Sequence, residues 1–535
     1  MTESPAQPTG GETPQRSPQR RPTSTPPLYG ALAGLVAGAV AVTVGMLVAE
    51  ILDVVSPIDA VGSEFIDRVP PWLREQAIQW FGTNDKTALR VGIVAVLVIA
   101  SLVVGYLTVR WRIAGVIGIG LFGLIGAIAA WHRPGESIGA ALPSLIGAAV
   151  GIPLLLWLVH PQRVEYPTRS RVPLGWDRRR FLVSTGSAAA AAVVAGALAD
   201  VLENRRIETI RDAIPDSLPP VAAPGGVVNG TSVDIPAGAT VSPVTPFITQ
   251  AGDFYRIDTA LSFPRIGLDN YQVEISGMVD KPLTLTYADL QARPQVERVV
   301  TLCCVSNEVG GDLISTAVFQ GVLLAPLLKE AGVQQGAEQV YSESLDGWTC
   351  GFPVEVALDG RDAMIAIGMN GEALPLEHGF PARLVVPGLY GYVSATKWLK
   401  KIELTTWAAE EGYWVPLGWS RDGPIKTESR IDVPRDGKNV AAGASKIAGI
   451  AWAQHRGVAK VEVQIDDGAW QEAKLGTDVT DDSWRQWSLD WDAKPGTYTI
   501  QVRATDKDGD TQTADHAPPD PDGATGYHTR NVRVV

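Results

Sequence analysis

The first two hundred residues contain five long apolar runs, at residues 29–52, 91–109, 113–131, 137–159 and 181–201. A helix needs about 20 apolar residues to cross the roughly 30 Å hydrocarbon core of a bilayer. Five core helices of a soluble domain would instead show a polar stripe along one side. The pattern therefore predicts a four-helix membrane anchor over residues 28–160 and a fifth transmembrane helix within residues 161–203.

A different pattern begins at about residue 250. "YQVEISGMV" (271–279) alternates with the period of a strand, "TYADLQA" (286–292) begins like a capped helix, and "GVLLAPLLKEAGV" (321–333) has helical spacing with a Gly stop. This mixture predicts an α+β domain over residues 250–407.

The last part of the chain has strand periods alone. Val461, Val463 and Ile465 alternate with polar residues ahead of an Asp-Gly turn, and residues 498–502 do the same. Short strands with such turns predict an immunoglobulin-like β-sandwich over residues 408–535. We expect its tryptophans to pack in the core and not to bind a ligand.

Two segments show neither period. Residues 1–27 are rich in Pro, Ser, Thr and Arg and cannot bury enough apolar surface to offset the entropy of ordering, which predicts a disordered tail. Residues 204–249 are rich in proline and predict an extended linker.

The distribution of charge also changes along the chain, at about residue 203. The net charge is −13; residues 1–203 hold 16 Lys and Arg against 14 Asp and Glu, and the remainder holds 29 against 44. A nucleic-acid-binding domain needs a basic face, so the acidic second part excludes nucleic acid as a partner.

Arginines around the apolar runs predict their orientation, because basic loops stay on the cytoplasmic side. The basic segments are residues 16–21 before the first run, residues 110–112 between the second and third, and residues 163–180 before the fifth. Five crossings that start inside place everything after residue 203 outside. We expect a multi-pass protein of the cytoplasmic membrane, with its later domains on the extracytoplasmic side.

The fifth run opens with Arg178 and Arg179, one further residue, and then Phe181 and Leu182. This is similar to a twin-arginine export signal, here inside the chain. An ordinary basic flank of a transmembrane helix supplies the same arginines. The aromatic–leucine pair and the Ala/Gly-rich helix favour export, a route that carries folded proteins and suits a domain that acquires a cofactor in the cytoplasm.

The membrane part carries no predicted redox centre. None of the six histidines lies inside an apolar run and no C-x-x-C-H motif occurs, whereas a haem bundle needs paired histidines. Charges that would mark an ion pathway are nearly absent, with Glu50 close to one end of a run. We expect an anchor in the lipid bilayer, and a membrane transporter is the alternative.

Two of the three cysteines, Cys303 and Cys304, are adjacent at the end of an apolar strand-like run. Three interpretations compete: a disulfide, buried apolar thiols, and a reactive thiolate or ligand of a soft metal. An odd count leaves one thiol unpaired, and a zinc site would need further Cys or His close by. The residues alone also leave open whether Cys303 pairs with Cys350.

Four stretches resemble, in this order, the sulfite oxidase family of molybdopterin oxidoreductases. They are "TLCCVSNEVGG" (301–311), "FQGVLLAPLLKEAGV" (319–333), "MNGEALPLEHGFPARLVVPGLYGYVSATKWLKKIEL" (369–404) and "GYWVPLGWSRDGPIKTESRI" (412–431). The closing sandwich resembles that family's dimerisation domain, which implies a homodimer. The resemblance covers about residues 250–535.

The resemblance implies a molybdenum–molybdopterin cofactor with Cys304 as the protein's metal ligand. A thiolate suits a soft, sulfur-rich metal site. It also implies that His378, Arg383 and Lys397 line the pocket of the pterin's phosphate, for which Arg provides a planar fork of donors and Lys a point charge. Further cofactor contacts are implied for Tyr255, Arg256, Ser306, Asn307 and Ser394.

The chain departs from the sulfite-oxidising members where substrate would bind. Two arginines of those enzymes correspond to Glu308 and Val309, and their active-site tyrosine to Trp419. An anion site that loses a cationic fork and gains a carboxylate should bind sulfite poorly. Arg530, on the last strand, is a further candidate to reach the site. The predicted catalytic residues are Cys304, Trp419 and Arg530.

The resemblance thus implies an oxidoreductase that transfers an oxygen atom to or from a small molecule in a two-electron reaction. The apolar runs and the basic loops add that it is anchored in the membrane and faces outward. Electrons would pass to or from a separate partner, a cytochrome or a quinone-linked protein. The alternative from another class is an exported binding domain that keeps the fold without catalysis.

Overall fold

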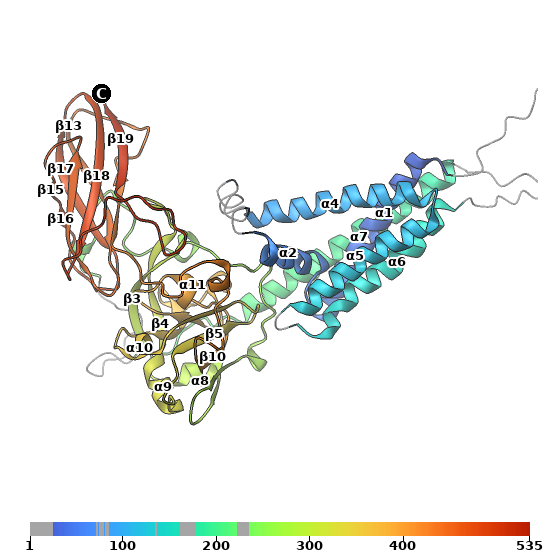
Figure 1. Ribbon diagram of the computed structural model, residues 1–535, viewed down its shortest axis with the longest axis horizontal. Coiled ribbons are helices and arrows are strands. Elements are labelled where there is room, and N and C mark those ends of the chain that lie inside the picture. The colour runs from blue at the N-terminus through green and yellow to red at the C-terminus, as the bar shows by residue number, and fades with distance from the viewer. Residues whose placement is uncertain are drawn as a thin grey trace, which may run out of the picture. The chain divides into compact units, whose positions relative to one another are not determined.

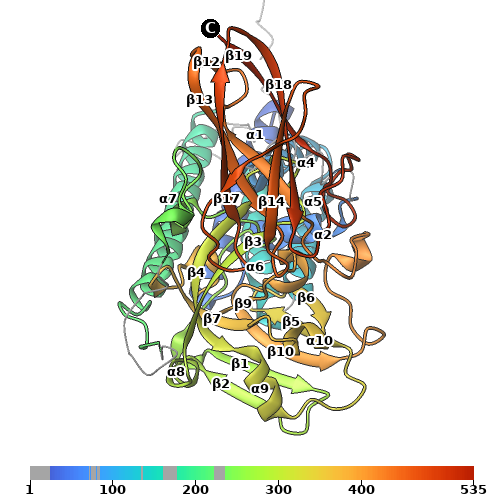
Figure 2. The same cartoon turned by 90° about the vertical axis from the view of Figure 1, so that its left-hand side faces the viewer.

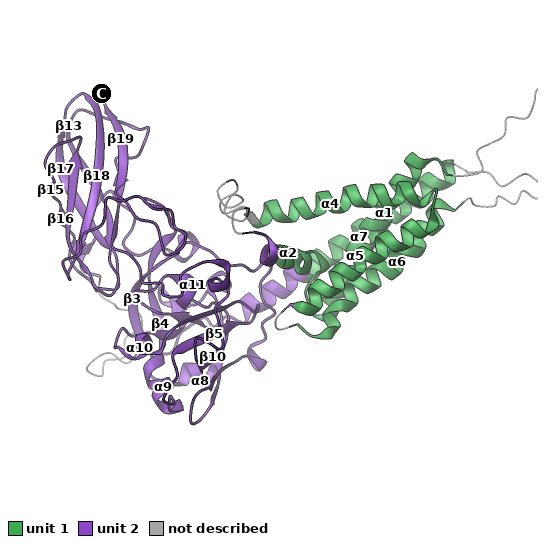
Figure 3. Cartoon of the chain, in the orientation of Figure 1, with its two compact units in different colours: residues 1–65, 76–132, 136–202 green, residues 66–75, 133–135, 203–535 purple. Residues whose placement is uncertain are grey.

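The computed structural model describes residues 25–70, 73, 80, 85–133, 136–160, 178–221 and 235–535. These residues fall into two compact units, shown in Figure 3. The first unit takes residues 1–65, 76–132 and 136–202, and the second takes residues 66–75, 133–135 and 203–535. Residues 1–24 of the predicted tail lie outside the described part of the chain, as do Arg163, Arg169 and Arg171 of the predicted basic loop.

The first unit is helical, and Figure 1 labels its elements. Five of its helices are long and apolar enough to cross a membrane, and they fall on the five predicted runs. The short amphipathic helix α2 was not expected from the sequence. The helices are α1 (Pro27–Leu52), α2 (Pro57–Arg68), α4 (Asp85–Thr108), α5 (Arg112–His132), α6 (Leu142–Val159) and α7 (Arg178–Asp212).

Small residues let these helices approach closely. A Cβ atom on Gly34 of α1 would lie 2.5 Å from the Cα atom of Gly105 in α4, and one on Gly45 would lie 3.1 Å from the carbonyl oxygen of Pro143 in α6. Lipid chains are as apolar as leucine, so helices in a bilayer associate through close packing of this kind.

The predicted linker is largely ordered where the structure describes it. Helix α7 continues past the expected end of its apolar run to Asp212, and Ile210 near its end is buried in the core of the second unit. Further on, Phe247 is buried and accepts a hydrogen bond from Nε1 of Trp484 at 2.9 Å, while Thr249 donates its N–H to Thr316 at 2.8 Å. The prediction of an extended linker over residues 204–249 missed these contacts, because they depend on partners far along the chain.

The second unit begins with the predicted α+β domain, built on two sheets that Figure 2 shows from the side. One sheet has the order β2-β1-β10-β5-β6, and the other β3-β4-β7-β8 with β9 paired to β7. The strands are β1 (Gln272–Gly277), β2 (Leu283–Thr286), β3 (Val296–Cys303), β4 (Ile314–Leu323), β5 (Gln339–Ser344), β6 (Thr349–Pro353), β7 (Met364–Met369), β8 (Glu372–Ala373), β9 (Arg383–Val385) and β10 (Leu399–Thr405).

Local sequence explains the short helices of this domain. Helix α8 (Tyr287–Ala292) starts with a capping box, in which Thr286 and Asp289 each bond to the other's backbone N–H. Helix α9 (Leu324–Ala331) ends at Gly332, whose φ of 72° is the left-handed conformation that glycine adopts without strain. Both helices were predicted. The others are α10 (Val354–Leu358) and α11 (Gly391–Ser394).

The closing part is a β-sandwich, as predicted. Its sheets have the orders β11-β13-β17-β16 and β12-β19-β18-β14-β15. Trp452, Trp484 and Trp487 are fully buried, in agreement with their expected packing role. The strands are β11 (Glu428–Val433), β12 (Asn439–Val440), β13 (Gly443–Trp452), β14 (Val458–Ile465), β15 (Gln471–Glu472), β16 (Lys474–Leu475), β17 (Arg485–Ala493), β18 (Gly496–Asp506) and β19 (His528–Val534).

Candidate functional site

The adjacent cysteines lie where β3 ends and a tight loop begins. Cys304 donates its N–H to the carbonyl of Leu313 at 3.0 Å and accepts the N–H of Asn307 at 3.0 Å. The side-chain oxygen of Asn307 accepts the N–H of Leu313 at 2.9 Å, which ties the loop to its own far end. The loop therefore fixes the backbone that carries Cys304, and the Nδ2 atom of Asn307 stays buried without a hydrogen-bond partner.

The Cys304 thiol is buried but sits among groups that favour its thiolate. Burial raises the pKa of Cys304, whereas hydrogen bonds from the backbone and hydroxyl of Ser306 and the charge of Lys397 act in the opposite direction. A bound metal ion deprotonates a coordinating thiol outright. This thiol can thus serve as a metal ligand and stays protonated otherwise.

Cys303 has a different environment. It is 1% exposed, lies in the hydrophobic core, and its Sγ atom is 3.5 Å from the carbonyl oxygen of Cys304. Burial, and next the nearby Glu428, hold the pKa of Cys303 well above its ordinary range. Cys303, Cys304 and Cys350 are all free thiols, so the structure contains none of the disulfides considered from the sequence.

Three cationic or titratable side chains from one stretch of chain are buried together beyond this loop. His378 (4% exposed) ends the short turn Leu376–His378, Arg383 (3% exposed) opens β9, and Lys397 precedes β10. Burial is the main cause that lowers the pKa of His378 to about 4, of Lys397 to about 8 and of Arg383 to about 10. Arg383 also lowers the pKa of His378 and of Lys397, which shows that the three lie close together.

The Arg383 guanidinium has more donors than acceptors around it. Arg383 donates to the backbone carbonyls of His378 at 3.2 Å and Leu384 at 3.4 Å, and no carboxylate of the described residues forms an ion pair with it. Nε2 of His378 bonds to the carbonyl of Ala251 at 2.7 Å, but Nδ1 is buried without a partner. A buried guanidinium normally requires a counter-charge. The pterin's phosphate fits this cluster because it would supply both the charge and the missing acceptors.

Residues 250–258 lie against the same cluster. Asp258 accepts a hydrogen bond from Nζ of Lys397 at 3.0 Å and another from Nε of Arg256 at 3.0 Å. Arg256 itself is largely exposed and lies over the ring of Phe263. The sequence drew attention to this segment but not to Asp258, whose carboxylate is the counter-ion of Lys397. Its partner lies 139 residues away, so no local pattern could reveal the pair.

Tyr255 lies near the cysteines, whereas Ser394 bonds within its own turn. Burial, and then the nearby Cys304 and Cys303, raise the pKa of Tyr255 well above its ordinary value. Its hydroxyl oxygen would lie 3.7 Å from a Cβ atom on Gly391, so it is close to the start of α11 and to the cysteines. The Ser394 hydroxyl instead donates to the backbone carbonyl of Tyr390 at 3.0 Å, which commits it to the local turn.

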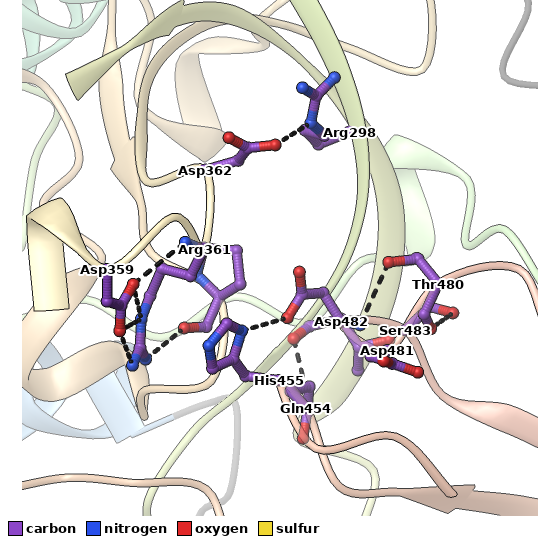
Figure 4. Close-up of polar contacts among 12 residues, drawn as sticks. Arg298, Asp359, Arg361, Asp362, Gln454, His455, Thr480, Asp481, Asp482 and Ser483 are labelled. Atoms are coloured by element: carbon purple, nitrogen blue, oxygen red, sulfur yellow. Dashed lines mark hydrogen bonds and ion pairs between the residues drawn. The ribbon is translucent and has the colours of Figure 1, made fainter. Parts of the chain in front are cut away.

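A polar cluster, shown in Figure 4, holds the turn that leads to α11. Nη1 of Arg361 donates to the carbonyl of Pro387 at 3.0 Å, and a Cβ atom on Gly388 would lie 3.0 Å from Cβ of His455. His455 approaches Asp482 to 3.5 Å. Gly388 has a φ of 83°, a left-handed conformation that favours glycine. The sandwich therefore packs directly behind this turn through His455.

The remaining predicted residues lie apart from each other: Trp419 packs beside α11 of the α+β domain, and Arg530 is on β19 of the sandwich. Trp419 packs at 5.8 Å from the ring of Tyr392 and at 6.1 Å from that of Trp414. Arg530 forms an ion pair with Asp436 at 3.0 Å, and no described contact joins it to Cys304. Sequence reasoning missed two residues of the sandwich that do touch the cysteine loop. Arg430 donates to the carbonyl of Gly311 at 2.7 Å, and the ring of His528 lies directly against Gly310.

Comparison with known proteins identifies the domain around Cys304. Residues 260–414 match the oxidoreductase molybdopterin binding domain, and residues 428–502 match the bacterial Ig domain. The uncharacterized oxidoreductase YuiH of Bacillus subtilis is 33% identical over 156 residues, which cover 29% of this chain and 75% of YuiH. The chain belongs to the family of molybdopterin-binding oxidoreductases. A molybdenum cofactor follows from that membership, as predicted.

Relatives with named activities match a smaller share of their own length. Human mitochondrial sulfite oxidase is 32% identical over 275 residues, covering 43% of this chain and 50% of that protein. The NADH nitrate reductase of Solanum lycopersicum is 35% identical over 177 residues, covering 28% of this chain and 19% of that protein. The chain thus spans about half or less of these two relatives, and its membrane-type helices lie outside the matched domains.

Proposed function

We propose that this protein is a membrane-anchored molybdenum-cofactor oxidoreductase whose catalytic domain faces outward and transfers an oxygen atom to or from a small molecule. The observation that carries the proposal is the buried guanidinium of Arg383, whose hydrogen bonds within the described part of the chain go to backbone carbonyls and not to a carboxylate. It lies beside the unpartnered Nδ1 of His378. A fold that buries a charge without a counter-ion loses stability, unless an anionic ligand completes the site.

Each residue of the cluster has a separate task in this proposal. The bound molybdenum supplies the two-electron oxygen-atom transfer. Cys304 holds the metal through its thiolate, and Ser306 stabilises that thiolate by hydrogen bonds. Arg383, His378 and Lys397 hold the phosphate, and Asp258 keeps Lys397 in place. Tyr255, Arg256, Asn307 and Ser394 contribute further contacts or shape the pocket around the pterin.

We infer a substrate other than sulfite. Glu308 is exposed on the cysteine loop and Val309 follows it, where the sulfite-oxidising members have arginines. A doubly charged anion would meet a carboxylate in place of a cationic fork. Neutral oxygen acceptors or donors, such as S-oxides or N-oxides and their reduced forms, avoid that repulsion. In this proposal Trp419 lines the pocket for such a substrate. Arg530 could contact the substrate only if its ion pair with Asp436 opened.

Metal analysis tests the cofactor assignment. The full chain is purified from a host that makes the pterin, together with Cys304→Ser and Cys303→Ser. We expect one molybdenum per chain in the wild type and in Cys303→Ser, and a lost or spectroscopically altered metal in Cys304→Ser. Wild-type protein that folds and carries no molybdenum would favour the alternative of a non-catalytic binding domain.

Substrate choice has its own test. In Glu308→Arg/Val309→Arg we expect sulfite oxidation with kcat/KM at least about tenfold above the wild-type value, because two cations are introduced on the cysteine loop. Glu355→Arg serves as a charge control on an exposed helix of the same domain. Equal sulfite activity in all three proteins would remove the argument against sulfite.

The membrane assignment rests on the five apolar helices and on the arginines between them. In this proposal the helices anchor the enzyme and a separate cytochrome or quinone-linked protein exchanges its electrons. A transporter with an accessory domain is the competing function. Deleting residues 28–160 would then abolish solute flux, whereas for an anchor it leaves molybdenum content and turnover with an artificial electron acceptor unchanged.

A further inference from the structure

One end of the first unit brings the ends of its five long helices together. Just before α1, Thr25 donates its hydroxyl to the carbonyl of Val159 at the end of α6, at 2.9 Å. The rings of Tyr29 in α1 and Phe181 in α7 meet edge to face at 5.3 Å. A Cβ atom on Gly30 would lie 2.9 Å from the carbonyl oxygen of Gly105 in α4. Helix α5 starts here as well, immediately after the turn that follows α4.

Exposed cationic side chains gather at this end. They come from the turn between α4 and α5 and from the first turn of α7, namely Arg110, Arg112, Arg178, Arg179 and Arg180. No Asp or Glu occurs in the described segments that form it, residues 25–31, 105–115, 153–160 and 178–186. The indole rings of Trp111 and Trp157 are about half exposed beside these arginines, as is usual at the interface of a bilayer.

Arg112 is held in place within this cationic end. Its Nη2 atom donates to Nδ1 of His160 at 2.6 Å, a bond that joins the start of α5 to the residue after α6. Because Nδ1 of His160 accepts in this bond, the guanidinium keeps its charge and its remaining donors. Arg110 lies over the ring of Trp111, 5.3 Å from its centroid. Neither arginine has a described carboxylate partner.

At the opposite end of the same helices, carboxylates meet partners within the protein. Arg90 at the start of α4 forms an ion pair with Asp59 of α2 at 3.0 Å, and His132 at the end of α5 lies 3.9 Å from Glu64. Glu136 accepts the backbone N–H of Val55 at 3.0 Å. A carboxylate of the protein thus pairs with Arg90 at one end, whereas Arg110 and Arg112 at the other end have no carboxylate partner among the described residues.

We propose that the cationic end is a binding site for the headgroup of an anionic phospholipid, whose phosphate lies between Arg110 and Arg112 and faces the arginines that open α7. The planar fork of arginine matches phosphate oxygens, and each cation near an anionic leaflet contributes about 1 kcal/mol. The proposal requires the five helices to cross a bilayer and does not depend on the oxidoreductase activity.

Lipid titration followed by native mass spectrometry tests the site. The full chain in detergent is titrated with phosphatidylglycerol and, separately, with phosphatidylcholine of the same acyl chains. We expect phosphatidylglycerol to bind more tightly to the wild type, and roughly 30-fold more weakly to Arg110→Gln/Arg112→Gln, the factor that corresponds to two arginines. Arg110→Lys/Arg112→Lys keeps the charge and should retain most of the affinity.

Two controls make the result decisive. Arg90→Gln removes one arginine from the opposite end and should leave phosphatidylglycerol affinity unchanged, and thermal unfolding in detergent confirms that each variant folds. Equal binding of the two lipids by the wild type overturns the proposal, as does equal phosphatidylglycerol affinity in the wild type and the glutamine variant. Competition by inorganic phosphate at the same concentration as the lipid would assign the site to free phosphate and overturn the lipid as its ligand.

Discussion

Arg383 donates a hydrogen bond from Nη1 to the backbone carbonyl of His378, 3.2 Å away, while the Nδ1 atom of that histidine has no partner. The guanidinium is buried beside this histidine and has donors to spare. Burying the guanidinium in this way costs free energy in the cofactor-free protein. Binding of an anion offsets that cost. Removing the charge should therefore raise the stability of the cofactor-free protein and lower its affinity for the cofactor.

Arg383→Met is the variant that separates the two effects. Methionine fills a similar volume without charge, so we expect apoprotein from a host that lacks the pterin to gain about 2 kcal/mol in its free energy of unfolding. Molybdenum content in a host that makes the pterin should fall at least about tenfold, because one phosphate contact is removed. Denaturant titration and metal analysis measure the two quantities.

Arg298→Met provides the matched control, because Arg298 forms a half-exposed ion pair with Asp362 at 2.7 Å. We expect little change in stability or metal content there. If Arg383→Met destabilised the apoprotein and left the metal content intact, the guanidinium would be a structural group and the phosphate site would lie elsewhere.

The pH dependence of the apoprotein should report His378. Burial lowers its pKa from 6.5 to about 4. Between these values the unfolded chain holds a proton that the folded protein does not, so the free energy of unfolding falls as the pH falls from about 6.5 to about 4. From pH 7 to pH 5 this residue accounts for a loss of about 2 kcal/mol.

Urea titrations of the wild type and His378→Gln at pH 7 and pH 5 measure that share. The variant should lose about 2 kcal/mol less over this interval. Burial also lowers the pKa of His528 to about 4. Since His528 is still present in the variant, part of the pH dependence of the free energy of unfolding remains. Identical pH profiles would mean that His378 carries a proton in the folded state at pH 5.

Prediction from the sequence worked best where the determinants are local. The cap of α8 needs only Thr286 and Asp289, and the five apolar runs need only length and composition. The motif around Cys304 predicted the family and its cofactor. The counter-ion of Lys397 could not be predicted in this way, since Asp258 lies 139 residues away along the chain. The same holds for the unpartnered atoms of His378 and Arg383, which are defined by what surrounds them.

The turn at Gly388 should tolerate no side chain. Its φ of 83° strains an alanine by about 1 kcal/mol, and the new Cβ would also crowd Nη1 of Arg361 at 3.1 Å. We expect Gly388→Ala to lower the free energy of unfolding by about 2 kcal/mol. Gly437 has a φ of 67°, and no atom lies within 4 Å of an added Cβ. Gly437→Ala therefore measures the backbone strain alone, without the steric contact. Equal losses in both variants would show that the turn has room for a methyl group.

Export of the second unit depends, in our interpretation, on the identity of Arg178 and Arg179 and not only on their charge. Both are exposed at the start of α7, three and two residues ahead of the apolar stretch that begins at Phe181. Arg178→Lys/Arg179→Lys preserves the positive flank that orients a transmembrane helix, but it removes the pair that a twin-arginine pathway reads. We expect residues after 203 to stay inside the cell in this variant, where protease added to intact spheroplasts cannot reach them.

The basic-flank interpretation makes the opposite prediction for the same variant. If the arginines act only through charge, the lysine pair leaves the second unit outside and accessible to protease. Arg110→Lys/Arg112→Lys makes the same change in the turn between α4 and α5, and both interpretations expect normal export there. Since a twin-arginine route carries folded proteins, a lysine block should also leave protein that has already bound molybdenum on the inner side. Metal content of the retained protein therefore distinguishes a failure of export from a failure of folding.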